Sequence, residues 1–167
     1  MYREEETGVN YICDPVLFEK CTALTNCASV FNRMYGFDSL QPQIHPLMFS
    51  KQTKVTNVYE LFMGTKVSGA VSPLLFGNCV NSITDATKMF AYTNITSMSA
   101  NFLNGGGKNT KLKTIYGIFY NCTNLEGVSP EFWNGAKFTA MGGGDSNGYA
   151  GALSGCTKLG NYSAAQA

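Results

Sequence analysis

The sequence contains little charge. Charged residues make up 14% of the 167 residues, about half the share of an ordinary globular protein. Twelve Lys and Arg residues stand against eleven Asp and Glu residues, so the formal net charge is +1. This balance creates no electrostatic field that would attract nucleic acid or an anionic membrane surface. We therefore expect no nucleic-acid partner.

Segments that direct export or membrane insertion are also missing. The stretch MYREEETGVNYIC has three consecutive glutamates where a secretory signal has basic residues followed by an apolar region. No apolar run in the sequence approaches the ~18 to 20 residues that span a bilayer. We expect neither an export signal in this stretch nor insertion into a membrane.

Ligands for a metal ion are scarce. The chain has one histidine, His45, and no CxxC pair, so zinc lacks a convincing set of ligands. Six cysteines could form a disulfide framework in a secreted chain, but Cys122 and Cys156 fall where other repeats have Thr65 and Thr93. A position that alternates Cys with Thr needs a small side chain. We therefore expect free thiols, no metal and no cofactor.

Catalytic groups cannot be located either. The eleven acidic residues are scattered, and none recurs at one position of the repeat. His45 lies in QIHPLMF between apolar residues, without an evident nucleophile near it in the sequence. The glycine-rich GGGDSNG has one carboxylate, whereas calcium needs six to eight oxygen ligands. The sequence predicts a protein that is not an enzyme.

What the chain does contain is an internal repeat. A bulky apolar residue ends a short apolar stretch five times, at intervals of 31, 28, 29 and 34 residues. These anchors are Phe31, Phe62, Phe90, Phe119 and Leu153. Such a period indicates similar units stacked on one another, because each unit alone cannot bury its apolar side. We expect one domain over residues 1–167, with about five repeats and partial repeats at both ends.

Each repeat has the same internal order. Before the anchor, apolar residues lie three and four apart, as in VTNVYELF, which predicts a short helix. These helices are expected near 25–34, 56–63, 84–91, 113–120 and 149–155. After a polar turn comes an apolar pair at spacing three, such as Val67 and Ala70, which predicts a strand of about four to five residues. A proline follows the strand at Pro42, Pro73 and Pro130, and ends its hydrogen bonding. The expected fold is an α/β repeat solenoid.

Three phrases carry a family resemblance. VTNVYELF, ITDATKMFAYTNITSM and LKTIYGIFYNCTNLEGV resemble the BspA-type leucine-rich repeats of bacterial surface proteins, and the similarity covers about residues 24–162. The resemblance implies a leucine-rich-repeat-like right-handed coil, with short helices on one side and a short-stranded parallel sheet on the other.

The same resemblance implies a function. It points to a non-enzymatic adhesion module of an extracellular or cell-surface protein, which contacts protein or glycan on a host or neighbouring cell. Repeat domains of this kind also occur on phage particles. The alternative is therefore a structural or host-attachment component of a virion or tail, with another subunit of the assembly as its partner.

The strands supply the expected binding residues. Side chains between and just after each apolar pair are expected to point outward, and they are small, polar and weakly charged. Such a row suits broad contact with protein or glycan more than enclosure of a small substrate. The candidate binding residues are Asp38, Ser68, Thr96, Ser97, Glu126 and Asn161.

Both ends of the array lack a polar cap in the sequence. YICDPVLF resembles the strand of a repeat and the apolar stretch that follows it, without the helix before them. GCTKLGNYSAAQA stops just after a strand. An uncapped unit exposes the apolar face meant for its neighbour. We expect a longer array or a second subunit to complete it, through the C-terminal edge in particular.

Overall fold

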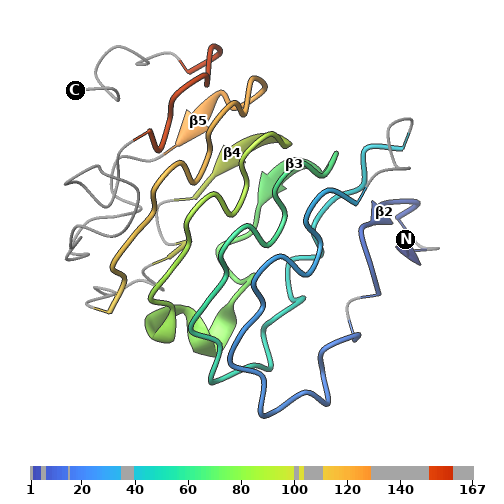
Figure 1. Ribbon diagram of the computed structural model, residues 1–167. Coiled ribbons are helices and arrows are strands. Elements are labelled where there is room, and N and C mark those ends of the chain that lie inside the picture. Colours follow the sequence, from blue (N-terminus) through green and yellow to red (C-terminus); the bar gives the residue numbers. More distant parts are fainter. Residues whose placement is uncertain are drawn as a thin grey trace.

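The chain passes back and forth across one stack. The computed structural model describes residues 2–4, 7–14, 16–34, 40–99, 102–103, 111–128 and 151–159. We call one repeat of the chain, with its turn segment and the strand that follows it, a pass. Figure 1 shows successive passes lying side by side in sequence order, from the blue N-terminal end to the orange and red C-terminal end.

One side of the stack is a parallel sheet. Strands β3 (Ser68–Val71), β4 (Asn94–Met98) and β5 (Gly127–Val128) pair in the order β3-β4-β5. Single parallel bridges extend it from Ser68 to Gln43 and from Gln43 to Tyr11. Strands β1 (Tyr2–Arg3) and β2 (Asn10–Tyr11) form a separate antiparallel pair. The sheet thus takes one short segment from each of five successive parts of the chain.

Two details of this sheet differ from the sequence expectation. Val67 and Val71 are buried and Ala70 is exposed, because the pairing of β3 with β4 is irregular between Gly69 and Ala70. The apolar spacing in this repeat is therefore four and not three. Pro42 does not end a strand: the next residue, Gln43, makes the bridges to its neighbours, and the Pro42 carbonyl accepts a hydrogen bond from the Ser68 N–H at 2.9 Å.

The other side of the stack is built from turns. Among the described residues the one helix is a 3-10 helix, η1 (Gly77–Ser82). Overlapping turns stand in place of the helices that the sequence predicts near 25–34, 56–63, 84–91 and 113–120, and in place of the described part, 151–155, of the helix predicted near 149–155. We call this set of turn segments the turn ladder, and its members are residues 27–34, 58–65, 86–93, 115–122 and 151–156.

Hydrogen bonds of the turn ladder alternate between two directions. In segment 86–93, the N–H groups of Met89, Ala91 and Thr93 donate to carbonyls three residues earlier in the same segment. The N–H groups of the residues between them donate to carbonyls of the next pass at 2.8 to 3.1 Å. Segments 27–34 and 58–65 repeat the pattern. Half of the donors therefore stabilise the segment, and the other half join it to its neighbour.

Backbone dihedral angles explain why these segments are not helices. Two residues in each segment, four apart, have positive φ, as Lys88 (50°) and Tyr92 (61°) do. A residue with positive φ cannot continue a right-handed helix. The turns still bury residues three and one apart, such as Val58, Leu61 and Phe62. The apolar spacing of the sequence is therefore shared by a helix and by this chain of turns.

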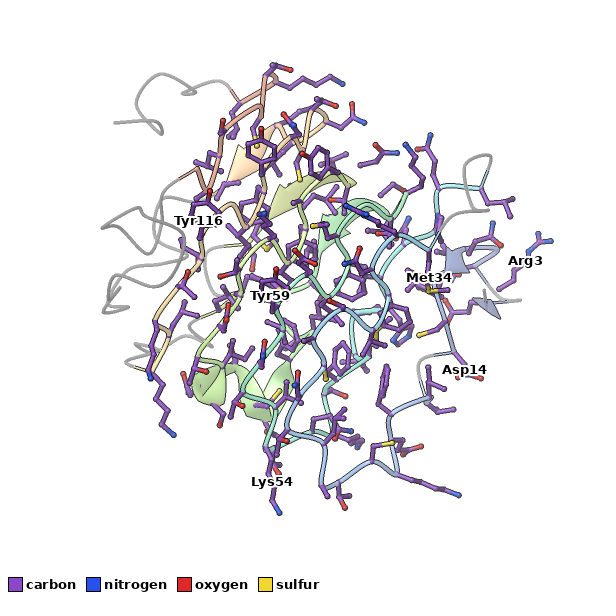
Figure 2. All side chains as sticks on the ribbon, viewed as in Figure 1. Arg3, Asp14, Met34, Lys54, Tyr59 and Tyr116 are labelled. Atoms are coloured by element: carbon purple, nitrogen blue, oxygen red, sulfur yellow. The ribbon has the colours of Figure 1, made fainter. Side chains whose placement is uncertain are left out.

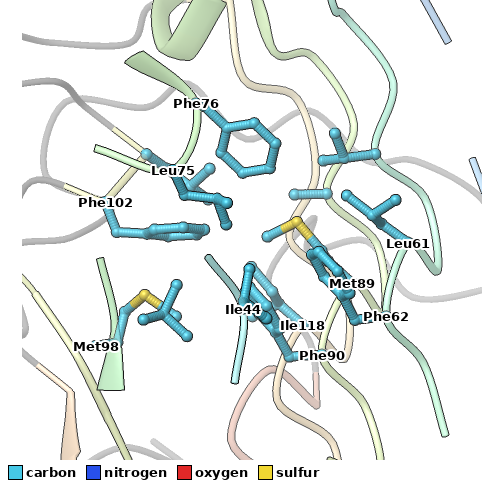
Figure 3. Close-up of a cluster of buried hydrophobic side chains, with 14 of the residues drawn as sticks. Ile44, Leu61, Phe62, Leu75, Phe76, Met89, Phe90, Met98, Phe102 and Ile118 are labelled. Carbon is cyan, nitrogen blue, oxygen red and sulfur yellow. The ribbon is translucent and has the colours of Figure 1, made fainter. Parts of the chain in front are cut away.

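Two stacks of phenylalanine rings fill the space between the sheet and the turn ladder. Phe31, Phe62, Phe90 and Phe119 stack with ring centroids 5.4 to 5.8 Å apart and planes 1° to 5° apart. A second row takes one ring from the apolar segment that follows each strand, which we call the return segment. Its rings are Phe18, Phe49, Phe76 and Phe102, of which the last two are tilted by 56° to each other. Figure 3 shows Phe90 and Phe102 in one cluster with neighbouring aliphatic side chains, and their centroids are 5.6 Å apart.

A row of small polar side chains ends the turn segments. Thr65, Thr93, Cys122 and Cys156 are all buried at equivalent positions. The Thr65 and Thr93 hydroxyls donate to the carbonyls of Phe62 and Phe90 at 2.7 Å, and the Cys156 thiol donates to the Phe119 carbonyl at 3.1 Å. The two hydroxyls thus bond within their own segment, whereas the thiols bond the preceding segment, since Cys122 likewise donates to the Phe90 carbonyl at 2.9 Å. All six cysteines are free in the structure.

Candidate binding groove

A groove crosses the end of the parallel sheet where β3 and β4 finish. Its volume is about 470 Å³, within the range of ligand sites in proteins. Its lining, as far as the described residues show it, comes from four successive parts of the chain and carries no charged side chain. The lining residues are Tyr11, Gln43, Ile44, Pro46, Ala70, Val71, Ser72, Pro73, Ser97, Met98 and Ser99.

A glycine of β3 makes room for the one amide in the groove. Gly69 has φ +79°, a conformation that L side chains rarely adopt. A Cβ at Gly69 would lie 3.4 Å from Cδ of Gln43. The Gln43 side chain therefore lies across the space that a larger residue would fill, and it is exposed to solvent. Its amide can both donate and accept hydrogen bonds.

Tyr11 forms a fixed wall of the groove. Its ring is buried and meets the His45 ring edge-on, with centroids 4.8 Å apart. Its hydroxyl donates a hydrogen bond to Glu4 Oε2 at 3.4 Å. Burial raises the pKa of the Tyr11 hydroxyl, and the nearby Glu4 carboxylate raises it further. Tyr11 therefore stays neutral and supports the groove more than it reaches into it.

Three serines also line the groove. Ser72 Oγ accepts a hydrogen bond from the Leu74 N–H at 3.1 Å, so its own proton is free to be donated. Ser99 Oγ is buried and makes no hydrogen bond in the described part of the chain. Ser97, in β4, is half-buried. Together with the Gln43 amide, the Ser72 and Ser97 hydroxyls present donors and acceptors without net charge, whereas the buried Ser99 hydroxyl is not accessible from the groove.

One of the six predicted binding residues lines the groove, and that residue is Ser97. Ser68 instead donates its hydroxyl proton to the Gln41 carbonyl at 2.7 Å. Thr96 is half-buried in β4, and Glu126 is exposed just before β5; neither lines the groove. Asp38 and Asn161 lie outside the described residues. Of the four predicted residues that are described, only Ser97 therefore belongs to the groove, and the row itself stays a prediction.

A simple sequence signal pointed to the missed serines. Ser72 and Ser99 directly follow the last buried residues of their strands, Val71 and Met98. The pattern of an apolar residue followed by serine returns at Val128 and Ser129. A serine that recurs at one repeat position is as informative as the recurring phenylalanine. The residue types of Tyr11 and Gln43, by contrast, do not recur at the equivalent positions of the next two repeats, Ser68 and Asn94.

His45 has a structural role. Its Nδ1 accepts a hydrogen bond from the Leu47 N–H at 3.1 Å. In the equivalent turns, Asp14 Oδ1 accepts from the Val16 N–H and Ser72 Oγ accepts from the Leu74 N–H. Burial lowers the pKa of His45, against the opposite effect of the Glu4 and Asp14 carboxylates. A neutral imidazole is what this acceptor position requires.

Ligand clusters and membrane spans were also sought in the described ranges. They contain no group of three or more His, Cys, Asp or Glu side chains that could hold a metal ion. They also contain no helix long and apolar enough to cross a membrane. Comparison of the chain with family models, with curated proteins and with solved structures finds no match.

Proposed function

We propose that the chain is a repeat solenoid of the leucine-rich-repeat type and acts as a non-enzymatic binding module. Its ligand is an extended, uncharged stretch of protein or glycan that lies in the groove at the end of the sheet. The observation that carries this proposal is the uncharged lining, which crosses four successive parts of the chain. Parallel pairing between residues 25 to 32 apart supports the repeat solenoid.

The dimensions of the groove fit a short piece of chain. Neighbouring strands lie ~4.8 Å apart, so four of them span about 14 Å, the length of about four extended peptide residues. The polar groups along this line are the Gln43 amide and the Ser72 and Ser97 hydroxyls. These groups match the amides of a peptide or the hydroxyls of a sugar. A phosphate or carboxylate would find no opposite charge among the lining residues.

The place of action follows from the family resemblance. Similarity of the repeat phrases to BspA-type repeats supports a bacterial cell surface, with a host protein or glycan as the partner. The alternative, a component of a virion or tail, is favoured by a different observation. The first segment of the turn ladder leaves an apolar residue, Val30, uncovered at one edge of the stack.

The groove can be tested by filling it. Ala70 is exposed and lines the groove, so Ala70→Arg adds bulk and charge without entering the core. Tyr59→Arg is the matched control, because Tyr59 is also exposed but lies on the turn ladder. The wild-type chain and both variants are applied to an array of neutral and acidic glycans and to a library of immobilised peptides.

The expected result is binding of neutral glycans or uncharged peptides by the wild-type chain and by Tyr59→Arg, and loss of that binding in Ala70→Arg. The array separates the two ligand classes. Equal loss in both variants, or retention in Ala70→Arg of everything that the wild-type chain binds, would contradict the groove as the binding site.

A further inference from the structure

The first segment of the turn ladder is uncovered on its N-terminal side. Val30 is 45% exposed, whereas its equivalents Leu61, Met89 and Ile118 are 0% exposed. Met34 is 36% exposed, although Thr65, its equivalent, is fully buried. Figure 2 labels Met34 on the side of the stack where the blue N-terminal passes lie. This edge therefore carries the side chains of an interior position without a neighbour to cover them.

The backbone of this edge presents acceptors only. In the next segment, the carbonyls of Tyr59, Leu61 and Met63 accept hydrogen bonds from the pass before them. The equivalent carbonyls in segment 27–34 accept none from the described part of the chain, and they belong to Ala28, Val30 and Asn32. The N–H groups between them all donate to the next pass. Three carbonyls, two residues apart, thus form an unfilled row.

The opposite edge of the ladder presents donors. In segment 151–156, the Ala152 and Ser154 carbonyls accept from Phe119 and Asn121 at 2.9 and 2.8 Å. The Leu153 N–H occupies the position at which Phe31, Phe62 and Phe90 donate to a following pass. In the described part of the chain it has no acceptor, and neither has the Gly151 N–H. The two edges are therefore complementary in spacing and in hydrogen-bond direction.

We propose that the N-terminal edge of the turn ladder binds the C-terminal edge of a second copy of this chain, head to tail. The N–H groups of Gly151 and Leu153 in one copy donate to the Ala28 and Val30 carbonyls in the other, in the register that joins successive segments within one chain. The same register places Ala152 of the first copy over the exposed Val30. This proposal depends on the edges alone and is independent of the groove.

Hydrogen-bond direction decides the geometry of the contact. Two N-terminal edges cannot pair through their turn segments, because both present carbonyls. The contact is therefore heterologous, with a different surface on each partner, and it leaves one edge of each kind free after every addition. Chains can grow in this way, and the near-zero net charge does little to oppose it.

Val30→Glu tests the N-terminal edge. Val30 is exposed, so the variant keeps the fold but places a carboxylate against the incoming apolar face. Leu74→Glu is the control, because Leu74 is an aliphatic residue of similar exposure (57%) in a return segment. The full-length wild-type chain and both variants are examined by native mass spectrometry and sedimentation velocity over a wide concentration range, after circular dichroism has shown unchanged spectra.

We expect dimers and longer species for the wild-type chain and for Leu74→Glu, and monomer for Val30→Glu. Mixing isotopically labelled wild-type chain with Val30→Glu then tests direction. The variant retains its C-terminal edge, so a mixed dimer forms although the variant alone does not dimerise. A monomeric wild-type chain, equal loss of association in both variants, or absence of the mixed dimer would each overturn the proposal.

Discussion

Lys88 offers a direct test of the turn ladder, because glycine and alanine have opposite effects in a helix and in a turn with positive φ. Lys88 lies in the middle of segment 86–93 with φ 50°, and its amine is 5.9 Å from the centre of the Tyr116 ring. Lys88→Gly and Lys88→Ala both remove this contact. The difference between the two variants therefore isolates the backbone.

The expected difference can be worked out from two opposing effects. A left-handed conformation costs an L residue roughly 1–2 kcal/mol, which glycine avoids. Glycine loses about 0.5–1 kcal/mol relative to alanine through the greater freedom of its unfolded chain. Lys88→Gly should therefore be more stable than Lys88→Ala by about 0.5–1 kcal/mol. In a helix the order would be reversed, with Gly about 0.8–1 kcal/mol less stable than Ala.

Urea unfolding measures this difference. With a slope of about 2 kcal/mol per molar urea, the midpoint of Lys88→Gly should lie about 0.3–0.5 M above that of Lys88→Ala. Gly117 and Gly151, which occupy the same position in the two later segments with φ 56° and 64°, show that the chain already uses glycine there. A midpoint for Lys88→Ala above that for Lys88→Gly would refute the turn conformation at this residue.

Three further perturbations probe the core and the turns. Phe90→Ala should lower the free energy of unfolding by about 3–5 kcal/mol, because Phe90 contacts Phe62, Phe102 and Phe119; a loss below about 1 kcal/mol in urea unfolding would mean that the ring stack is wrong. Gly64→Ala should destabilise by about 1–2 kcal/mol, since φ is 69° and a Cβ would lie 3.1 Å from Arg33 Cγ. Its control, Gly127→Ala, meets open space and should be close to neutral. Burial raises the pKa of Cys122 to about 11 and of Cys156 to about 12, from an ordinary 9.0. Between these values the folded thiols keep protons that unfolded thiols lose, so the melting temperature should fall as the pH rises from about 9 toward 11. The fall should be smaller in the Cys122→Thr/Cys156→Thr variant.

The sequence predicts the repeat positions well and their backbone conformation poorly. The anchors Phe62, Phe90 and Phe119 recur because one ring must stack on the next, and that demand is visible as a period of 28 or 29 residues. Apolar spacing of three and four does not separate a helix from overlapping turns, since both bury one face. The sign of φ at Glu60 or Lys88 has no signal in the residue type. Only Gly117 and Gly151, at the same position, hint at it.

The groove residues were harder to predict because they lie where strands end. An outward row was expected along the strands, but the irregular pairing between Gly69 and Ala70 moves Ala70 into the groove. Gln43 packs against Gly69 of the neighbouring repeat, at a distance where an added Cβ would be in ordinary van der Waals contact, and this neighbour is not visible in the sequence around Gln43. Ser97 is the residue that both belongs to the predicted row and lines the groove. Contacts between repeats are set by the pairing register, and a single sequence does not contain it.

The turn ladder has a polarity that an ordinary sheet edge lacks. Along the edge of a β-strand, N–H and C=O groups alternate, so two such edges of the same kind can pair. Within the turn segments, every N–H that leaves a segment points to the next pass, and every carbonyl that leaves points to the previous one. Two identical edges therefore cannot hydrogen-bond to each other through these segments, and only opposite edges are complementary. Natural edge strands are commonly blocked by a charged side chain, whereas this chain has Val30 at the exposed position of its first segment. Under the proposed head-to-tail contact, a charged side chain at this position, as in Val30→Glu, is therefore expected to seal the edge against a second copy.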